Sequence, residues 1–239
     1  MKRFMYLLSG IFTILVFSAS AQQQGDPKST EVWEPIPKLV NPGKQNDQPP
    51  SDAIVLFNGK DLSEWITIKN EPAKWNVRDN TMIVKKGTGD IQTTKLFGDC
   101  QLHIEWRSPT VIESEGQGRG NSGIFLMGKY EVQVLDSYNN RTYSNGQAGS
   151  IYKQYIPLVN ATRQPGEWQT YDIIFTAPRF HEDGSLRSPA YVTVIHNGVL
   201  IQNHVELKGP TVYIGQPSYK KHADKEPIIL QDHLIAVVL

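Results

Sequence analysis

The stretch Y-E-V-Q-V-L-D, residues 130–136, decides the fold class because its side chains alternate between polar and apolar. A period of two is typical of a β-strand, whose successive side chains point to opposite faces. Glu131 and Gln133 therefore share one face, and Val132 and Val134 share the other. The apolar face predicts packing on a core. The alternation alone leaves open whether the polar face meets bulk water or a substrate.

A second stretch, Q-L-H-I-E-W-R at residues 101–107, repeats this pattern. Its apolar face carries Leu102, Ile104 and Trp106, and its polar face carries His103, Glu105 and Arg107. We expect the polar faces of the two strands to line one groove if both strands lie in one curved sheet. The alternative is a solvated outer face. His, Glu, Arg and Gln are side chains that bind sugars, which favours the groove.

The rest of the chain has many strand signals and almost no helix signals. Runs bounded by Gly, Asn, Asp and Pro predict further strands at 54–57, 75–77, 81–84, 122–127, 167–176, 190–196, 199–205, 212–214 and 228–230. In H-N-G, residues 196–198, the Asn-Gly pair predicts a type I′ hairpin turn. The pattern predicts an all-β sandwich of two antiparallel sheets.

The first fifty residues predict an exported protein. Residues 1–21 combine Lys2 and Arg3 with a short apolar run and small residues at Ala19 and Ala21, which is typical of a cleaved signal peptide. Residues 22–52 are rich in Gln, Pro and Asn and predict an extended leader, and residues 53–239 predict one domain. We expect a periplasmic or extracellular location without stable membrane insertion, because no cysteine follows the cleavage site as a lipid attachment point.

Charge and cysteine content limit the classes of binding partner and rule out a stabilising intrachain disulfide. The chain has 24 acidic and 24 basic residues with no basic run, so its composition does not support nucleic-acid binding and favours a neutral small-molecule or oligosaccharide partner. Cys100 is the single cysteine, so the chain cannot form an intrachain disulfide.

Seven stretches, in order along the chain, resemble the 3-keto-disaccharide hydrolase family. They are residues 56–65 (L-F-N-G-K-D-L-S-E-W), 120–126 (G-N-S-G-I-F-L), 130–138, 146–161, 165–180, 196–205 and 230–233 (L-Q-D-H). The resemblance implies a concanavalin-A-like jelly roll related to that of the laminarinase and lichenase glucanases. After L-Q-D-H this sequence departs from the family pattern, so we expect the last strand to be shortened or replaced.

The related glucanases carry E-x-D-x-E or E-x-D-x-x-E on one strand, and the longer spacing corresponds here to Glu131, Gln133 and Asp136. An amide in the middle position cannot ionise. Glycoside hydrolysis by direct displacement normally needs two carboxyl groups about 5–10 Å apart, so a conventional β-glucanase is disfavoured.

A 3-keto sugar, which the resemblance implies as substrate, needs less from the enzyme. Its ketone acidifies the C2 proton, so a base can remove that proton, the C1 aglycone can leave by elimination, and water can then add. Glu131 is the leading candidate for the base, with Gln133, Asp136 and Lys153 as further catalytic candidates. A divalent cation is one candidate for stabilising the enolate, with Glu131, His103 and His233 as candidate ligands.

The remaining candidates are substrate-binding residues: His103, Glu105, Arg107, Arg119 and Asn121. A non-catalytic carbohydrate-binding module is the alternative function, because jelly rolls also serve lectins. A conventional β-glucanase is the second alternative.

Overall fold

The computed structural model describes residues 25–44 and 48–233, which fall into two units divided after Ala53. In the first unit, residues 27–30 form a short 3-10 helix (Pro27–Thr30), and nearly all of the described side chains are exposed. The predicted signal peptide, residues 1–21, lies outside the described residues and stays a prediction. Among the described residues, none lies in a helix with the length and apolar character needed to cross a bilayer.

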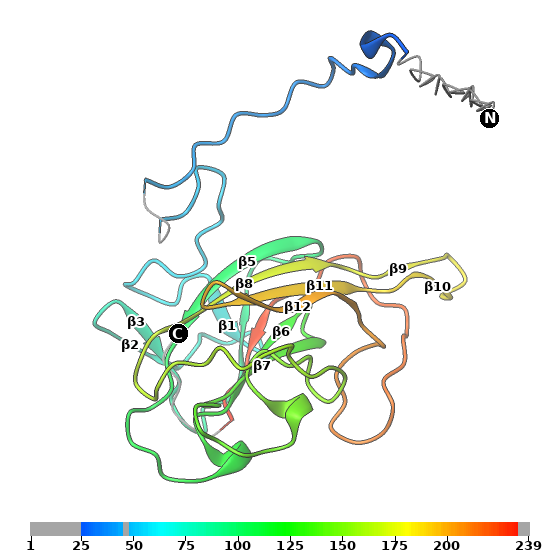
Figure 1. Ribbon diagram of the computed structural model, residues 1–239. Coiled ribbons are helices and arrows are strands. Elements are labelled where there is room, and N and C mark those ends of the chain that lie inside the picture. Colours follow the sequence, from blue (N-terminus) through cyan, green and yellow to red (C-terminus); the bar gives the residue numbers. More distant parts are fainter. Residues whose placement is uncertain (1–24, 45–47, 234–239) are drawn as a thin grey trace, which may run out of the picture. The chain divides into compact units, whose positions relative to one another are not determined.

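The second unit, residues 54–239, is built from antiparallel strands in two main sheets (Figure 1). One sheet has the order β1 (Trp65–Thr67), β4 (Ile91–Thr93), β13 (Ile229–Leu230), β6 (Ser122–Leu126) and β7 (Tyr130–Val134). The other has the order β12 (Val199–Glu206), β11 (Tyr191–His196), β8 (Gln169–Thr176) and β5 (Cys100–Trp106). The predicted all-β sandwich of two antiparallel sheets is therefore confirmed.

Smaller elements complete the domain. Two-stranded ribbons pair β2 (Asn76–Arg78) with β3 (Thr81–Ile83), and β9 (Arg179–Phe180) with β10 (Leu186–Ser188). Short 3-10 helices occur at Gly116–Gly118 and Ser144–Gly146. Two predicted strands, at 54–57 and 212–214, are wrong because neither segment joins a described sheet, and β1, β4, β9 and β10 were not predicted.

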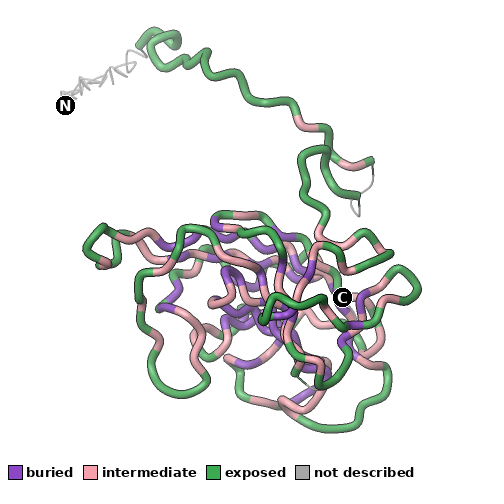
Figure 2. The backbone as a smooth tube through the Cα atoms, turned by 180° about the vertical axis from the view of Figure 1, so that it is seen from behind, coloured by how far each residue is buried: buried purple, intermediate pink, exposed green. Residues whose placement is uncertain are grey.

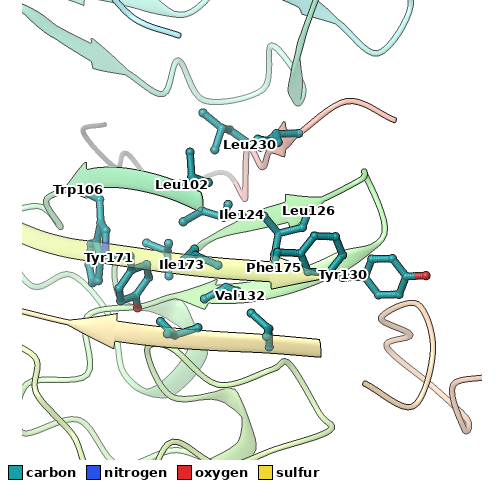
Figure 3. Close-up of a cluster of buried hydrophobic side chains, with 14 of the residues drawn as sticks. Leu102, Trp106, Ile124, Leu126, Tyr130, Val132, Tyr171, Ile173, Phe175 and Leu230 are labelled. Carbon is teal, nitrogen blue, oxygen red and sulfur yellow. The ribbon is translucent and has the colours of Figure 1, made fainter. Parts of the chain in front are cut away.

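The two main sheets pack face to face through the apolar sides of their strands (Figure 3). Tyr130 of β7 lies 5.6 Å, ring to ring, from Phe175 of β8, and the Tyr171 hydroxyl of β8 donates to the Gln133 carbonyl of β7 at 2.9 Å. Burying a large apolar side chain contributes roughly 1.5–3 kcal/mol. Figure 2 shows the buried stretches gathered inside this domain.

The hairpin between β11 and β12 has the predicted turn. Asn197 and Gly198 have φ angles of 52° and 80°, as a type I′ turn requires. His196 ends β11 and is buried against Trp106, with ring centroids 5.8 Å apart. Burial lowers the pKa of His196 to about 4, so the ring is a neutral part of the core.

Candidate active site

The polar face of β7 points away from the core. Val132 and Val134 pack between the sheets, and the alternation therefore turns Glu131 and Gln133 to the outer face of the five-stranded sheet. Both side chains are nevertheless buried, at 5% and 1% exposed. Polar groups on an outer sheet face are buried only where other segments cover them, so this part of the sheet forms the base of a covered site.

Residue 123 on the neighbouring strand β6 leaves room for the Glu131 carboxylate. Gly123 is the cross-strand partner of Gln133. A Cβ atom at position 123 would lie 2.7 Å from Glu131 Oε1 and 2.8 Å from Phe125 Cε2. The glycine is thus required by the close approach of the carboxylate and not by the backbone conformation.

A pocket of about 380 Å³ opens over this face. Its lining residues come from β6, β7, the segment before β6, residue 152, the loop after β12 and the residues that follow β13: Asn121, Phe125, Glu131, Gln133, Tyr152, Thr211, Tyr213, Gln231 and His233. The volume suits a small-molecule ligand. The lining combines aromatic rings with hydrogen-bonding groups, and Glu131 is the one carboxylate in it among the described residues.

The outer edge of β7 is paired with the chain at residues 149–152. The backbone amide of Gln133 donates to the backbone carbonyl of Ser150 at 3.0 Å, and the backbone amide of Tyr152 donates to the backbone carbonyl of Glu131 at 3.3 Å. Ile151 forms an isolated bridge with Val132. In this register Tyr152 is the cross-strand neighbour of Glu131, so the two side chains share one face.

Burial alters the acidity of Glu131. Loss of hydration, with a smaller effect from the negative charge of Asp90, raises the pKa of Glu131 to about 8. A carboxyl group with this pKa exchanges protons near neutral pH. It suits the role of a general base or acid.

The side-chain amide of Gln133 is adjacent to the Glu131 carboxyl group. Its nitrogen donates to Gln117 Oε1 at 3.1 Å and to Asn121 Oδ1 at 3.3 Å. With the amide turned over, the nitrogen instead lies 3.0 Å from Glu131 Oε1 and 3.1 Å from the Ser122 carbonyl. The first orientation suits a protonated Glu131, which donates to the amide oxygen, and the second suits the carboxylate. Gln133 is therefore placed to orient Glu131 in both protonation states.

Asp136 and Arg119 lie outside the pocket lining and neutralise each other. Arg119 Nη2 and Nε donate to Asp136 Oδ2 at 2.6 and 2.9 Å, and both side chains are largely buried. Arg119 also donates to the Tyr138 carbonyl. The structure thus places Asp136 beside Arg119 and not in the pocket lining with Glu131, and the predicted roles of both residues stay predictions. Asn121, by contrast, lines the pocket.

The expectation that residues 101–107 share a groove with residues 130–136 is wrong. β5 belongs to the four-stranded sheet and β7 to the five-stranded sheet. His103 and Glu105 are exposed, with His103 Nδ1 2.7 Å from Asp172 Oδ1. The Arg107 guanidinium lies 5.0 Å from the Trp168 ring centroid. These residues are not brought together with Glu131, because strand pairing over long sequence distances places β5 in the other sheet.

Lys153 points to the rim beside the pocket lining. Its Nζ donates to the Tyr213 carbonyl at 2.8 Å and lies 4.0 Å from the Tyr213 ring centroid. Lys153 therefore holds the loop that carries Tyr213. Its neighbour Tyr152, which was not among the predicted site residues, lines the pocket instead. The bridge of Ile151 to Val132 places residue 152 beside Glu131, a pairing that sequence alternation alone does not reveal.

The candidate metal ligands are not assembled. His233 lines the pocket with Glu131, whereas His103 lies in the other sheet. Across residues 25–44 and 48–233, no three side chains of His, Cys, Asp or Glu are placed to hold a metal ion together. Of the three candidate ligands, the pocket therefore brings together Glu131 and His233 alone.

Several pocket residues carried no sequence signal. Thr211 Oγ1 accepts from the Glu131 backbone amide at 3.0 Å, and Tyr213 is 69% exposed at the pocket mouth. Tyr213 lies in the segment predicted as a strand at 212–214, and Thr211 directly precedes that segment. Gln231 and His233 follow β13, where the Gln231 amide donates to the Gly123 carbonyl at 3.1 Å.

Together, the fold and the site place the chain among concanavalin-A-like jelly-roll sandwiches that carry a polar pocket on the outer face of one sheet. The chain belongs to the 3-keto-alpha-glucoside-1,2-lyase-like domain family, whose model matches residues 52–237. This confirms the family resemblance seen in the sequence.

Solved structures agree with this membership. A candidate glycosyl hydrolase from Parabacteroides distasonis ATCC 8503 is 55% identical, with a TM-score of 0.85, over 89% of this chain and 93% of that chain. A second candidate glycosyl hydrolase from the same organism, 22% identical with a TM-score of 0.55 over 77% of this chain and 89% of that chain, shares the fold. No match is found among curated proteins.

Proposed function

We propose that the protein is a carbohydrate-active enzyme that cleaves 3-keto-glycosides between C1 and the aglycone oxygen. The observation that carries the proposal is the lone pocket carboxylate, Glu131, among the described residues, with its pKa raised to about 8 by burial. One base suffices for elimination from a 3-keto sugar. The description of the family and the similarity to a candidate glycosyl hydrolase support the same class of substrate.

The proposed reaction begins when the Glu131 carboxylate removes the C2 proton and the electron pair delocalises onto the C3 oxygen. The enolate then re-forms the C3 carbonyl, a C1–C2 double bond forms, and the C1–oxygen bond breaks. The aglycone oxygen takes up a proton. Water adds at C1, and Glu131, whose proton has exchanged with solvent, protonates C2, so the net change is hydrolysis.

Direct displacement, as in a conventional β-glucanase, is poorly supported by this pocket. It needs two carboxyl groups about 5–10 Å apart across the scissile bond. Gln133 cannot ionise, and Asp136 is paired with Arg119. In the described part of the pocket, the second carboxyl group of such a mechanism is therefore missing.

The test compares a 3-keto-α-glucoside with its parent α-glucoside in D2O. We expect aglycone release and deuterium uptake at C2 from the keto sugar alone, and loss of both in the Glu131→Gln variant. Release from the parent α-glucoside, or from the corresponding β-glucoside assayed beside it, would favour a conventional glycosidase that acts by direct displacement. Binding of the keto sugar without release or exchange would favour a carbohydrate-binding module.

A further inference from the structure

Tyr152 is a second proton-bearing group beside Glu131. Its backbone amide donates to the Glu131 carbonyl at 3.3 Å, and both side chains line the pocket. The neighbouring bridge between Ile151 and Val132 fixes this register. Tyr152 is therefore held against the strand that carries the base, and its position does not depend on a free loop.

The phenol of Tyr143 is hydrogen-bonded to that of Tyr152. The Tyr152 and Tyr143 hydroxyls are 2.6 Å apart, and Tyr143 is 40% exposed to solvent. The Lys153 ammonium lies 5.8 Å from the Tyr152 ring centroid and 5.6 Å from that of Tyr143. This arrangement connects the Tyr152 hydroxyl to bulk water and provides a nearby positive charge when the phenol loses its proton.

The resting state of Tyr152 is the protonated phenol. Burial, followed by the hydrogen bond with Tyr143 and the charges of neighbouring groups including Glu131, raises the pKa of Tyr152. A phenol with a raised pKa keeps its proton until a strong base forms next to it. An alkoxide leaving group is such a base.

We propose that Tyr152 is the catalytic acid that protonates the departing aglycone oxygen, a role that rests on the proposed function. As the C1–oxygen bond breaks, the Tyr152 O–H bond breaks and its proton joins the aglycone oxygen, which leaves as a neutral alcohol and forms the phenolate. The phenolate then takes a proton from the water that adds at C1, while Glu131 returns a proton to C2. Both side chains end in their starting states, and the overall reaction consumes one water.

The other polar residues of the pocket fit this role less well. Thr211 uses its hydroxyl oxygen to accept from the Glu131 amide. His233 and Tyr213 are exposed. Tyr152, in contrast, has an intermediate exposure and a hydroxyl oriented by Tyr143.

The test replaces Tyr152 by Phe and varies the leaving group. With an alkyl or sugar aglycone, which needs a proton to leave, we expect kcat/KM to fall about 100- to 1000-fold. With a p-nitrophenyl aglycone, which leaves readily as an anion, the fall is expected to be less than about tenfold. Deuterium uptake at C2 should persist in Tyr152→Phe with either aglycone, because Glu131 is intact.

Tyr155→Phe is the matched control. Tyr155 lies outside the pocket lining, with Lys208 Nζ 5.0 Å from its ring centroid. Loss of the Tyr155 hydroxyl should therefore leave kcat/KM unchanged with both aglycones. Thermal unfolding of each variant checks that the fold is retained. Tyr143→Phe should show the same leaving-group dependence as Tyr152→Phe, but a smaller one.

If folded Tyr152→Phe loses kcat/KM equally with both aglycones, or loses none with either, the proposed role of Tyr152 is overturned while the proposed function stands. Loss of C2 exchange in this variant would likewise remove the distinction between acid and base. If the unmodified protein releases nothing from any 3-keto-glucoside, the proposed function and the role of Tyr152 fail together.

Discussion

Strands β5 and β7 have the same sequence pattern and different surroundings. In β7, Glu131 and Gln133 are buried beneath other segments, whereas in β5, His103 and Glu105 are exposed to solvent. In both strands the apolar side packs into the same core. The difference shows that alternation determines which side chains share a face, while the chain segments that cross the sheet determine what that face meets.

The covering segments come from distant parts of the sequence. Asn121 precedes β6, Tyr152 lies beyond the loop after β7, Thr211 follows β12 and His233 follows β13. The corresponding face of β5 carries the exposed pair of His103 with Asp172. The contrast between the two faces can be tested by matched substitutions.

Glu131→Gln against Glu105→Gln should give the largest difference. Removal of a general base typically costs about 100- to 10,000-fold in rate, so we expect kcat/KM on a 3-keto-α-glucoside to fall by about 1000-fold for Glu131→Gln. Glu105→Gln should stay within about twofold because its side chain is solvated. Steady-state kinetics measures both. Similar losses in the two variants would remove the functional distinction between the strands.

Asp136→Ala should reduce stability by about 3–5 kcal/mol, because it leaves the largely buried Arg119 guanidinium without its carboxylate. Asp172→Ala breaks an exposed pair and is the control, with an expected cost below about 1 kcal/mol. Urea unfolding at one pH measures both free energies. Equal costs would mean that burial of the first pair has no energetic consequence.

Glu131→Gln should increase stability above pH 8. Folding raises the pKa of Glu131 from its ordinary value of 4.5 to about 8, so the folded protein binds more protons than the unfolded chain in that window. The stability of the unmodified protein therefore falls as pH rises from about 4.5 to 8, and the neutral variant avoids a cost on the order of 5 kcal/mol. Unfolding at pH 5 and pH 9 measures the difference. A pH-independent difference would contradict the burial of an ionising Glu131.

The rate should depend on pH through the same group. Since the base form of Glu131 is the carboxylate, kcat/KM should rise as pH increases and level off above about 8. Between pH 6 and pH 8 the carboxylate fraction grows about 50-fold, and the rate should follow it. A flat profile over this range would exclude Glu131 as a base with a raised pKa.

His103→Ala should have the smallest effect. Its partner Asp172 is partly solvated, and an exposed pair contributes about 0–1 kcal/mol. Activity on the keto sugar should be unchanged, since His103 lies in the other sheet. A loss of activity larger than threefold would show that the outer face of β5 takes part in the site.

Local patterns predicted the strands well. The prediction at 130–135 contains β7, the prediction at 101–107 matches β5 to within one residue at each end, and H-N-G forms the expected turn. Strands β1 to β4 carry three residues each, too few for a period to show. The pair β2 and β3 is marked by the turn at Asp79 and Asn80 that joins them, whereas β1 and β4 pair with each other without such a turn between them. The sheet that each strand joins depends on pairing between residues far apart in sequence, as for β13 with β4 and β6, and no local pattern contains that information.

The site was predictable only where it lies on the strand itself. Sequence reasoning placed Glu131 and Gln133 on one face, and both line the pocket. It named Lys153 as a catalytic candidate, whereas Tyr152, one position earlier, is the residue that lines the pocket. The bridge of Ile151 to Val132, which places Tyr152 there, joins residues far apart in sequence and has no local signal. Thr211 and Tyr213 reach the pocket through tertiary folding of an irregular loop.

Because β7 is the edge strand of its sheet, Glu131 and Tyr152 lie on different parts of the chain, one on the sheet and one on the segment paired with its edge. Glu131 belongs to a sheet strand whose residues are all buried. The pocket wall next to it belongs to the chain around residues 143–155, which pairs with β7 without being one of the described strands. Exchanging that segment for a related one would leave the ladder of β6 with β7 intact. Under the proposed function, we therefore expect that replacing this one segment changes the leaving-group preference while the sheet that carries Glu131 is retained.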